Sequence, residues 1–198
     1  KLLSTIPRAS THSFSNDGKN IAAIITEVSQ IKVNNSDEKK RSSIKIFEIS
    51  SGKVLYEIDP GSSSAEPIET VFSPDDTKLL VAFSDYCLKM LDIKTNKSLF
   101  VITGRGPAAF SPDGRTIVTS ANSGLGSWYS SLDQVPRIFD AQTGRLIYRL
   151  EGHTDYVTSS LFSPDGKKIL TGSWPVTANL WDIKNGKYLP IDSKMPEL

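Results

Sequence analysis

The stretch Phe162-Ser163-Pro164-Asp165-Gly166 recurs along this chain of 198 residues, and its copies decide how the remainder is interpreted. Residues 110–114 are identical to it, residues 72–76 (Phe-Ser-Pro-Asp-Asp) nearly so, and residues 14–18 (Phe-Ser-Asn-Asp-Gly) form a weaker copy. Proline presets φ, aspartate bonds the backbone ahead of it and glycine accepts a positive φ, so each copy predicts a tight turn. An apolar residue precedes each turn and an apolar run follows it, which predicts a hairpin. Four copies indicate a repeat architecture.

A second recurring column supports the repeat. It consists of a large apolar residue, an acid and a smaller apolar residue: Phe47-Glu48-Ile49, Leu91-Asp92-Ile93, Phe139-Asp140-Ala141 and Trp181-Asp182-Ile183. Turn residues and another apolar run follow each of these triplets. Each unit is therefore expected to hold four short strands, lettered a to d in chain order. The expected units cover residues 8–59, 66–103, 107–151 and 155–192, within one all-β segment over residues 1–198.

With these residues in view, the chain resembles the WD-repeat (WD40) family of β-propellers. The likeness rests on Gly152-His153, the four turns, Thr171-Gly172-Ser173 and Trp181-Asp182. Gly-His, a period of about 40 residues and Trp-Asp are typical of that family. The resemblance implies an all-β propeller with about four antiparallel four-stranded blades. It covers nearly the whole chain, and the last unit matches best.

The number of units bears on how the propeller is built. Propellers of this family most often close with seven blades. Residues 1–6 look like a strand d of a preceding blade. We therefore expect this chain to form four blades of a larger ring. The alternative is an independent ring of four blades.

Two units carry extra residues between strands b and c. The strand-a phenylalanine and the strand-c anchor are 19 residues apart in units two and four, but 33 apart in unit one and 29 in unit three. In an antiparallel blade the b–c and d–a links leave at one end, so both insertions are expected on one face. Extra loop length on one face of a repeat protein is the usual location of function.

Each insertion has two interpretations. The first, residues 27–43, is polar and of mixed charge, which fits either a solvated loop or a charged contact with a partner. The second, residues 121–135, holds Trp128 and Tyr129 in a Gly/Ser-rich frame. Tryptophan and tyrosine dominate binding hot spots, although these two could also fold back onto the blade. The candidate partner-binding residues of the loop face are Arg105, Trp128, Tyr129, Tyr156 and Trp174.

The resemblance also implies a buried hydrogen-bond network in the last unit. In the family, a histidine before strand a, a hydroxyl in strand b, an aspartate between b and c and the strand-c tryptophan form a chain of bonds. Here His153, Thr171 or Ser173, and Trp181 supply three of these groups. Pro175 stands at the aspartate position, and because proline has no acceptor side chain, the chain of bonds should be broken or shortened.

Composition and motifs point away from catalysis. The 23 Lys and Arg residues nearly balance the 22 Asp and Glu residues, which gives no support for a nucleic-acid or membrane-surface partner. Cys87 is the lone cysteine, so the chain has no internal disulfide. The two histidines, His12 and His153, fall in different units, and no nucleophile elbow, zinc spacing or phosphate loop is present. We expect no metal, no cofactor and no enzyme activity.

The function that we expect is a non-catalytic scaffold, in which the face with the b–c and d–a loops binds partner proteins or peptides, as a subunit of a larger complex. One alternative is a sensing or recognition propeller of a larger signalling or enzymatic protein whose catalytic domain lies outside this sequence. A second is a propeller of the peptidase or translocation type, against which Gly152-His153 and Trp181-Asp182 argue. The expected location is the cytoplasm, with the nucleus as the alternative.

Overall fold

The computed structural model describes residues 5–6, 8–28, 40–60, 65–104, 108–120, 135–154, 157–173, 177–184 and 186–189. The chain divides into two compact units, Lys1–Ile102 and Thr103–Leu198, and each is considered by itself. The described residues form strands and turns and contain no helix. None of them therefore belongs to a helix long and apolar enough to cross a membrane.

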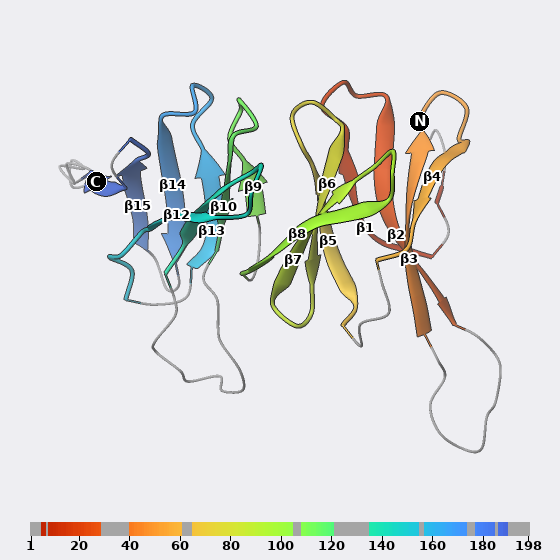
Figure 1. Cartoon of the computed structure of the whole chain (residues 1–198), viewed down its shortest axis with the longest axis horizontal. Coiled ribbons are helices and arrows are strands. Elements are labelled where there is room, and N and C mark those ends of the chain that lie inside the picture. The colour runs from red at the N-terminus through yellow and green to blue at the C-terminus, as the bar shows by residue number, and fades with distance from the viewer. Residues whose placement is uncertain are drawn as a thin grey trace, which may run out of the picture. The chain divides into compact units, whose positions relative to one another are not determined.

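Each unit holds two antiparallel sheets of four strands, and every sheet is a simple meander (Figure 1). In the first unit the strands are β1 (Ala9–Phe14), β2 (Asn20–Val28), β3 (Lys40–Glu48) and β4 (Val54–Ile58), then β5 (Pro67–Phe72), β6 (Lys78–Phe83), β7 (Cys87–Asp92) and β8 (Lys97–Thr103). In the second unit they are β9 (Ala108–Phe110), β10 (Thr116–Thr119), β11 (Arg137–Asp140) and β12 (Leu146–Arg149), then β13 (Val157–Phe162), β14 (Lys168–Ser173), β15 (Thr177–Asp182) and β16 (Lys187–Leu189). The predicted fold class, an all-β chain with four antiparallel four-stranded blades, is confirmed. Residues 1–4 lie outside the described part, so the strand expected at residues 1–6 stays a prediction.

The recurring turn owes its rigidity to its serine as much as to its proline and glycine. In the last copy the hydroxyl of Ser163 donates to Asp165 Oδ1 at 2.6 Å, and the Lys168 N–H donates back to that hydroxyl at 2.9 Å. Asp165 also accepts the Lys167 N–H at 3.0 Å, and Gly166 has φ of 68°. The other three copies repeat the bonds between serine, aspartate and backbone. Each hairpin therefore begins from the same closed polar ring.

Within each unit the core is a seam between two sheets. The earlier sheet contributes a forward row, which we define as the residue before the strand-a phenylalanine together with its cross-strand partners. The forward row is Ser13, Ala22, Ile46 and Tyr56 in the first unit, and Ala109, Val118, Ile138 and Tyr148 in the second. The later sheet contributes a Phe row, the phenylalanine and its partners: Phe72, Leu79 and Leu91, and likewise Phe162, Ile169 and Trp181. These rows supply much of the two apolar clusters, so each sheet hides one face against its neighbour.

The two seams differ at the turns. In the second unit the Pro112 ring lies against Gly166, where an added Cβ would stand 3.4 Å from Pro112 Cδ. In the first unit the equivalent residues are Asn16 and Asp76, which meet through hydrogen bonds. The Asp76 carboxylate accepts the backbone N–H of Asn16 at 2.7 Å and that of Asp17 at 3.0 Å. The Asn16 amide also donates to Asp76 and to the Ser73 carbonyl. An apolar contact in one seam is thus replaced by a polar latch in the other.

Asp76 takes up this position although its backbone has φ of 57°, a region that favours glycine. The bonds that it makes to two backbone N–H groups compensate for that conformation. Asparagine and aspartate are also the residues other than glycine that tolerate it best.

The polar latch can be tested by converting it to the residues of the other seam. We expect the double variant Asn16→Pro/Asp76→Gly to be more stable than the sum of the two single effects predicts, by about 1 kcal/mol. Each single replacement removes bonds without supplying the Pro–Gly contact, whereas the pair restores a contact that the fold already uses. Urea denaturation of the four proteins gives the coupling free energy. Strictly additive effects would contradict the latch.

Candidate interaction surface

The strand-c tryptophan of the last sheet is the centre of a buried hydrogen-bond network. The Trp181 indole N–H donates to the Thr171 hydroxyl at 2.7 Å, and that hydroxyl lies 2.6 Å from His153 Nε2. Trp181 is 1% exposed and Thr171 is fully buried. Because an indole N–H left without an acceptor in such a site would cost free energy, Thr171 allows a tryptophan to fill the seam.

The Gly-His pair is required by the same tryptophan. A Cβ on Gly152 would lie 3.1 Å from Trp181 Cη2, closer than an ordinary contact, and Gly152 has φ of 153°. Glycine therefore lets the chain pass over the indole ring and place His153 beside Thr171. The His153 and Trp181 ring centroids are 6.1 Å apart.

Among the described residues, the network ends at the histidine. His153 Nδ1 is buried and has no hydrogen-bond partner in the part of the chain that the structure describes. Burial lowers the pKa of His153, since a charged ring would lose its hydration there. Pro175, which takes the aspartate position, lies outside the described residues.

The structure brings His153, Thr171 and Trp181 together, but not Ser173. The Ser173 hydroxyl instead bonds the Thr177 hydroxyl across the start of the β14–β15 hairpin. Of the two hydroxyls proposed from the sequence, Thr171 is the one within reach of both rings.

The five candidate contacts of the loop face lie outside the described residues: Arg105, Trp128, Tyr129, Tyr156 and Trp174. Their place on that face stays a prediction.

The first b–c insertion is partly a β-ribbon. The last pair that joins β2 to β1 is Ile25 with Ala9, and the last that joins β3 to β4 is Ile44 with Ile58. Beyond these, β2 and β3 continue to pair with each other as far as Val28 and Lys40, and Figure 1 shows them running past their neighbours. The interpretation of residues 27–43 as a loop is therefore wrong at both ends. Thr26 and Val28 are β-branched, which favours the extended strand.

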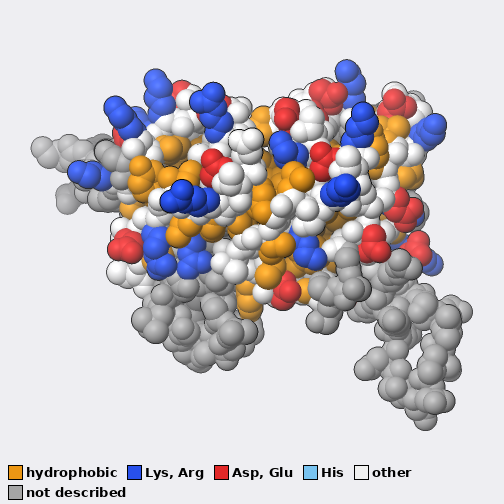
Figure 2. All heavy atoms as spheres, in the orientation of Figure 1, with side chains coloured by type: hydrophobic (Ala, Val, Ile, Leu, Met, Phe, Trp, Pro, Cys, Tyr) orange, Lys and Arg blue, Asp and Glu red, His pale blue; other side chains and the backbone are white. Residues whose placement is uncertain are grey.

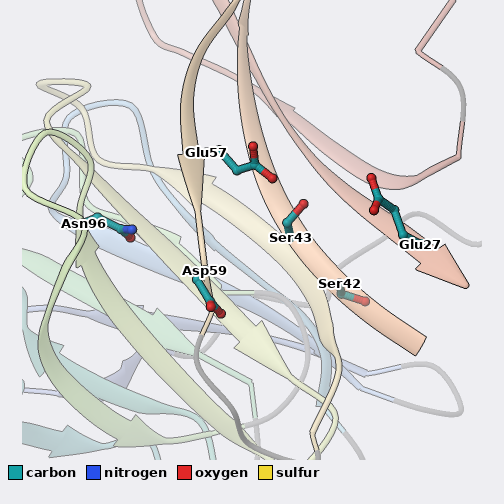
Figure 3. A pocket seen from close by; sticks show the side chains of 6 residues that line it. All are labelled: Glu27, Ser42, Ser43, Glu57, Asp59 and Asn96. Carbon is teal, nitrogen blue, oxygen red and sulfur yellow. The ribbon is translucent and has the colours of Figure 1, made fainter. Parts of the chain in front are cut away.

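A polar hollow of about 300 Å³ lies at the base of this ribbon (Figure 3). Its lining residues come from the ribbon, from β4 and the residue that follows it, and from the turn between β7 and β8. They are Glu27, Ser42, Ser43, Glu57, Asp59 and Asn96. Glu57 forms an ion pair with Lys45 at 3.5 Å. Sequence reasoning missed this hollow, because its residues come together only when β2, β3 and β4 pair and the turn between β7 and β8 of the next sheet lies beside them. The excess of carboxylates gives its lining an acidic character.

The recurring turn aspartates accept hydrogen bonds within their own turns. The Ser163 hydroxyl and then the Lys167 N–H lower the pKa of Asp165, and equivalent serine bonds lower those of Asp17 and Asp113. A carboxylate held ionised in this way is a poor general acid near neutral pH. Among the described residues, no group of three or more His, Cys, Asp or Glu side chains is placed to hold a metal ion.

Comparison with known proteins agrees with the architecture. The family model "WD domain, G-beta repeat" matches residues 144–182, which include Gly152-His153 and Trp181-Asp182. Residues 144–182 therefore match a WD repeat, and the chain is similar to WD-repeat proteins. The hydrogen-bond network thus lies in the part of the chain where the WD repeat is most complete.

Several curated WD-repeat relatives match longer stretches. The chain is 28% identical over 129 residues to a guanine nucleotide-binding protein subunit beta of Zea mays, which is 64% of this chain and 34% of the relative. It is 30% identical over 79 residues to the small ribosomal subunit protein RACK1 of Caenorhabditis elegans, 40% of this chain and 24% of the relative. It is 24% identical over 177 residues to the WD repeat-containing protein SL1-17 of Schistosoma mansoni, which is 86% of this chain and 54% of the relative. The chain spans about a third of the length of the first of these relatives.

Removing the WD-repeat tryptophan should be costly. We expect Trp181→Ala to lower the free energy of unfolding by about 3–5 kcal/mol, because it leaves a cavity in the seam. Trp181→Phe is the matched control, since the other three sheets carry Phe or Leu at this position. It should cost less, because the seam stays filled and only the bond to Thr171 is lost. Chemical denaturation measures both, and an unchanged midpoint for Trp181→Ala would argue against this seam.

The burial of His153 predicts a dependence of stability on pH. Because the pKa of His153 is lower folded than unfolded, the unfolded chain binds the proton first as the pH falls through about 6.5. His153 should therefore cause the chain to lose stability on acidification from pH 7.5 to 5.5. Urea midpoints measured across that window should fall more steeply for the wild type than for His153→Gln. Parallel slopes for the two proteins would be the contrary result.

Proposed function

We propose that this WD-repeat chain is a non-catalytic scaffold that binds partner proteins or peptides through the face bearing the b–c and d–a links. The observation that carries the proposal is the β-ribbon of β2 and β3, which extends a sheet beyond what its own blade needs. A ribbon that runs past the pairing of its own blade can offer its outer part to a partner. The hollow beside it offers polar and acidic groups to the same partner.

The opposite end of the blades supports the proposal by contrast. There the turn residues are engaged within the fold, as in the bonds from Asn16 to Asp76 and the packing of Pro112 on Gly166. The Tyr148 hydroxyl likewise donates to the Lys184 carbonyl across a seam. Because these turns make contacts across the seams, their residues are less able to be replaced to suit a partner.

The relatives support a role in assemblies. One is named as a subunit of a guanine nucleotide-binding protein, and another as a protein of the small ribosomal subunit. We propose that this chain likewise acts as a subunit of a larger complex, in the cytoplasm, with protein rather than nucleic-acid partners. The near balance of charges favours protein partners.

We further propose that the chain itself catalyses no reaction and needs no cofactor. The groups that could do chemistry in the best-matched repeat serve the fold instead. Both Thr171 and the Nε2 atom of His153 are bonded within the network, and Asp165 is committed to its turn.

A pull-down with matched variants tests the loop face. We expect Trp128→Ala/Tyr129→Ala, and separately Glu27→Lys/Asp59→Lys, to reduce recovery of partners by tenfold or more if these residues form hot spots, about 1.4 kcal/mol or more. Arg115→Ala is the control, because Arg115 belongs to an a–b turn at the opposite end and its side chain is 86% exposed. Circular dichroism establishes that each variant is folded. Partners retained by both loop-face variants, or lost with Arg115→Ala alone, would move the binding surface elsewhere.

A further inference from the structure

The strand β8 forms the outer edge of the sheet β5–β8. Its one hydrogen-bonded neighbour among the described strands is β7. With 7 residues, β8 is longer than the outer strands β4 and β12, which have 5 and 4. The edge of a strand presents a row of backbone N–H and C=O groups to which a further strand can pair. The length of β8 makes this row the longest on an outer strand of the described sheets.

The sequence of β8 lacks the charges that discourage such pairing. The tenth residue after the strand-c anchor is Glu57 in β4 and Arg149 in β12, but Val101 in β8. Charged side chains on an edge strand oppose the addition of another strand. After Lys97, β8 continues as Ser98-Leu99-Phe100-Val101-Ile102-Thr103, without a charge, a proline or a glycine. Six-residue segments of this composition pair readily with copies of themselves.

Two apolar side chains of β8 are exposed on one face of the strand. Leu99 is 46% exposed and Val101 is 52% exposed, whereas Ile102 between β8 and the core is 4% exposed. In Figure 1 β8 crosses in front of its sheet, and Figure 2 shows hydrophobic side chains between the charged ones on this side of the molecule. The sheet β5–β8 is neither the first nor the last of the described sheets, so this exposure belongs to an outer strand inside the repeat.

We propose that β8 of one copy of this chain pairs in the antiparallel direction with β8 of a second copy. Pairing centred on Phe100 places Leu99 of each copy opposite Val101 of the other. Since opposite residues of an antiparallel pair share a face, these four side chains form one apolar cluster. The two Lys97 residues then lie at opposite ends of the pair, each across from Thr103. A parallel pair in register would instead set Lys97 beside Lys97, which is unfavourable.

The arrangement is closed at two copies. The same edge is used by both copies, so the contact is isologous and follows a two-fold axis. The joined sheet has eight strands, and its two edges are the β5 strands, because β5 is the other edge strand of the sheet β5–β8. No second β8 edge is left for further growth, so the product is a dimer rather than a fibre.

The mass of the full chain in solution is the first test. Sedimentation equilibrium between about 5 and 100 µM would detect a contact with a Kd of about 10 µM. We expect the mass to rise with concentration from that of one chain towards that of two. A chain that stays monomeric over this range overturns the proposal, and so does a mass that continues to rise beyond two copies.

Complementary charges test the direction and the register. Leu99→Lys and Val101→Glu should each weaken self-association at least about tenfold, because a charge then lies opposite an apolar residue. Mixing the two variants should restore association. One position of the mixed pair joins Lys to Glu, and the other joins Val101 of one variant to Leu99 of the other. Association that the single variants leave unchanged, or that the mixture does not restore, contradicts this pairing.

A matched control uses another outer strand. Ile147 of β12 stands eight residues after its strand-c anchor, as Leu99 does in β8, and it is 41% exposed. Ile147→Lys should leave association unchanged, because β12 carries Arg149 at its edge. Weakening equal to that of Leu99→Lys would overturn the assignment to β8. Circular dichroism establishes that each variant is folded.

This proposal and the scaffold proposal can fail independently. The loop-face variant Trp128→Ala/Tyr129→Ala should leave the mass of the dimer unchanged, and Val101→Glu should leave the recovery of partners unchanged. A dimer lost with the loop-face variant would contradict pairing through β8.

Discussion

The structure depends on the contact between a Phe row and the forward row of the preceding sheet. A four-stranded meander has two faces, and a strand such as β6, with five buried residues in succession, cannot satisfy both against water. Phe72 and Leu79 are buried in one apolar cluster with Ala22, so each of these two sheets covers a face of the other. The repeat in the sequence follows from this packing. Within each half of the chain, one sheet supplies the forward row and the other supplies the Phe row of the same seam.

Much of the fold could be predicted because turn chemistry is local. The four copies of the turn that begins with Phe-Ser predicted the a–b hairpins and the strand count, and Trp181-Asp182 carried the resemblance to WD repeats. The role of the serine hydroxyl was not predicted, since a sequence does not reveal that Ser163 closes a ring with Asp165 and the backbone of Lys168. The polar latch was also missed. Its residues are 60 positions apart, and only the seam brings Asn16 to Asp76.

The candidate surface was harder to predict than the fold. The sequence located an insertion correctly but could not divide it into ribbon and link, because Lys40 to Ser43 are polar residues that a propensity argument assigns to a loop. Pairing with Thr26 and its neighbours overrides that local preference. Likewise, the resemblance implied a hydroxyl at either Thr171 or Ser173. Only the register of β14 against β15 distinguishes the residue beneath the indole from the one at the hairpin end.

The position of the ribbon follows from the seams. Residues added to an a–b turn would have to pass the contact that the turn makes with the neighbouring sheet, as Pro112 does with Gly166. Residues added to a c–d turn would similarly meet a residue such as Tyr148, which reaches the Lys184 carbonyl. Beyond Ile25 and Ile44, β2 and β3 pair with each other and no longer with β1 and β4 in the described strands, so the two strands can lengthen there together. The packing of the a–b and c–d turns thus explains why the added residues of this blade extend β2 and β3 at the b–c end.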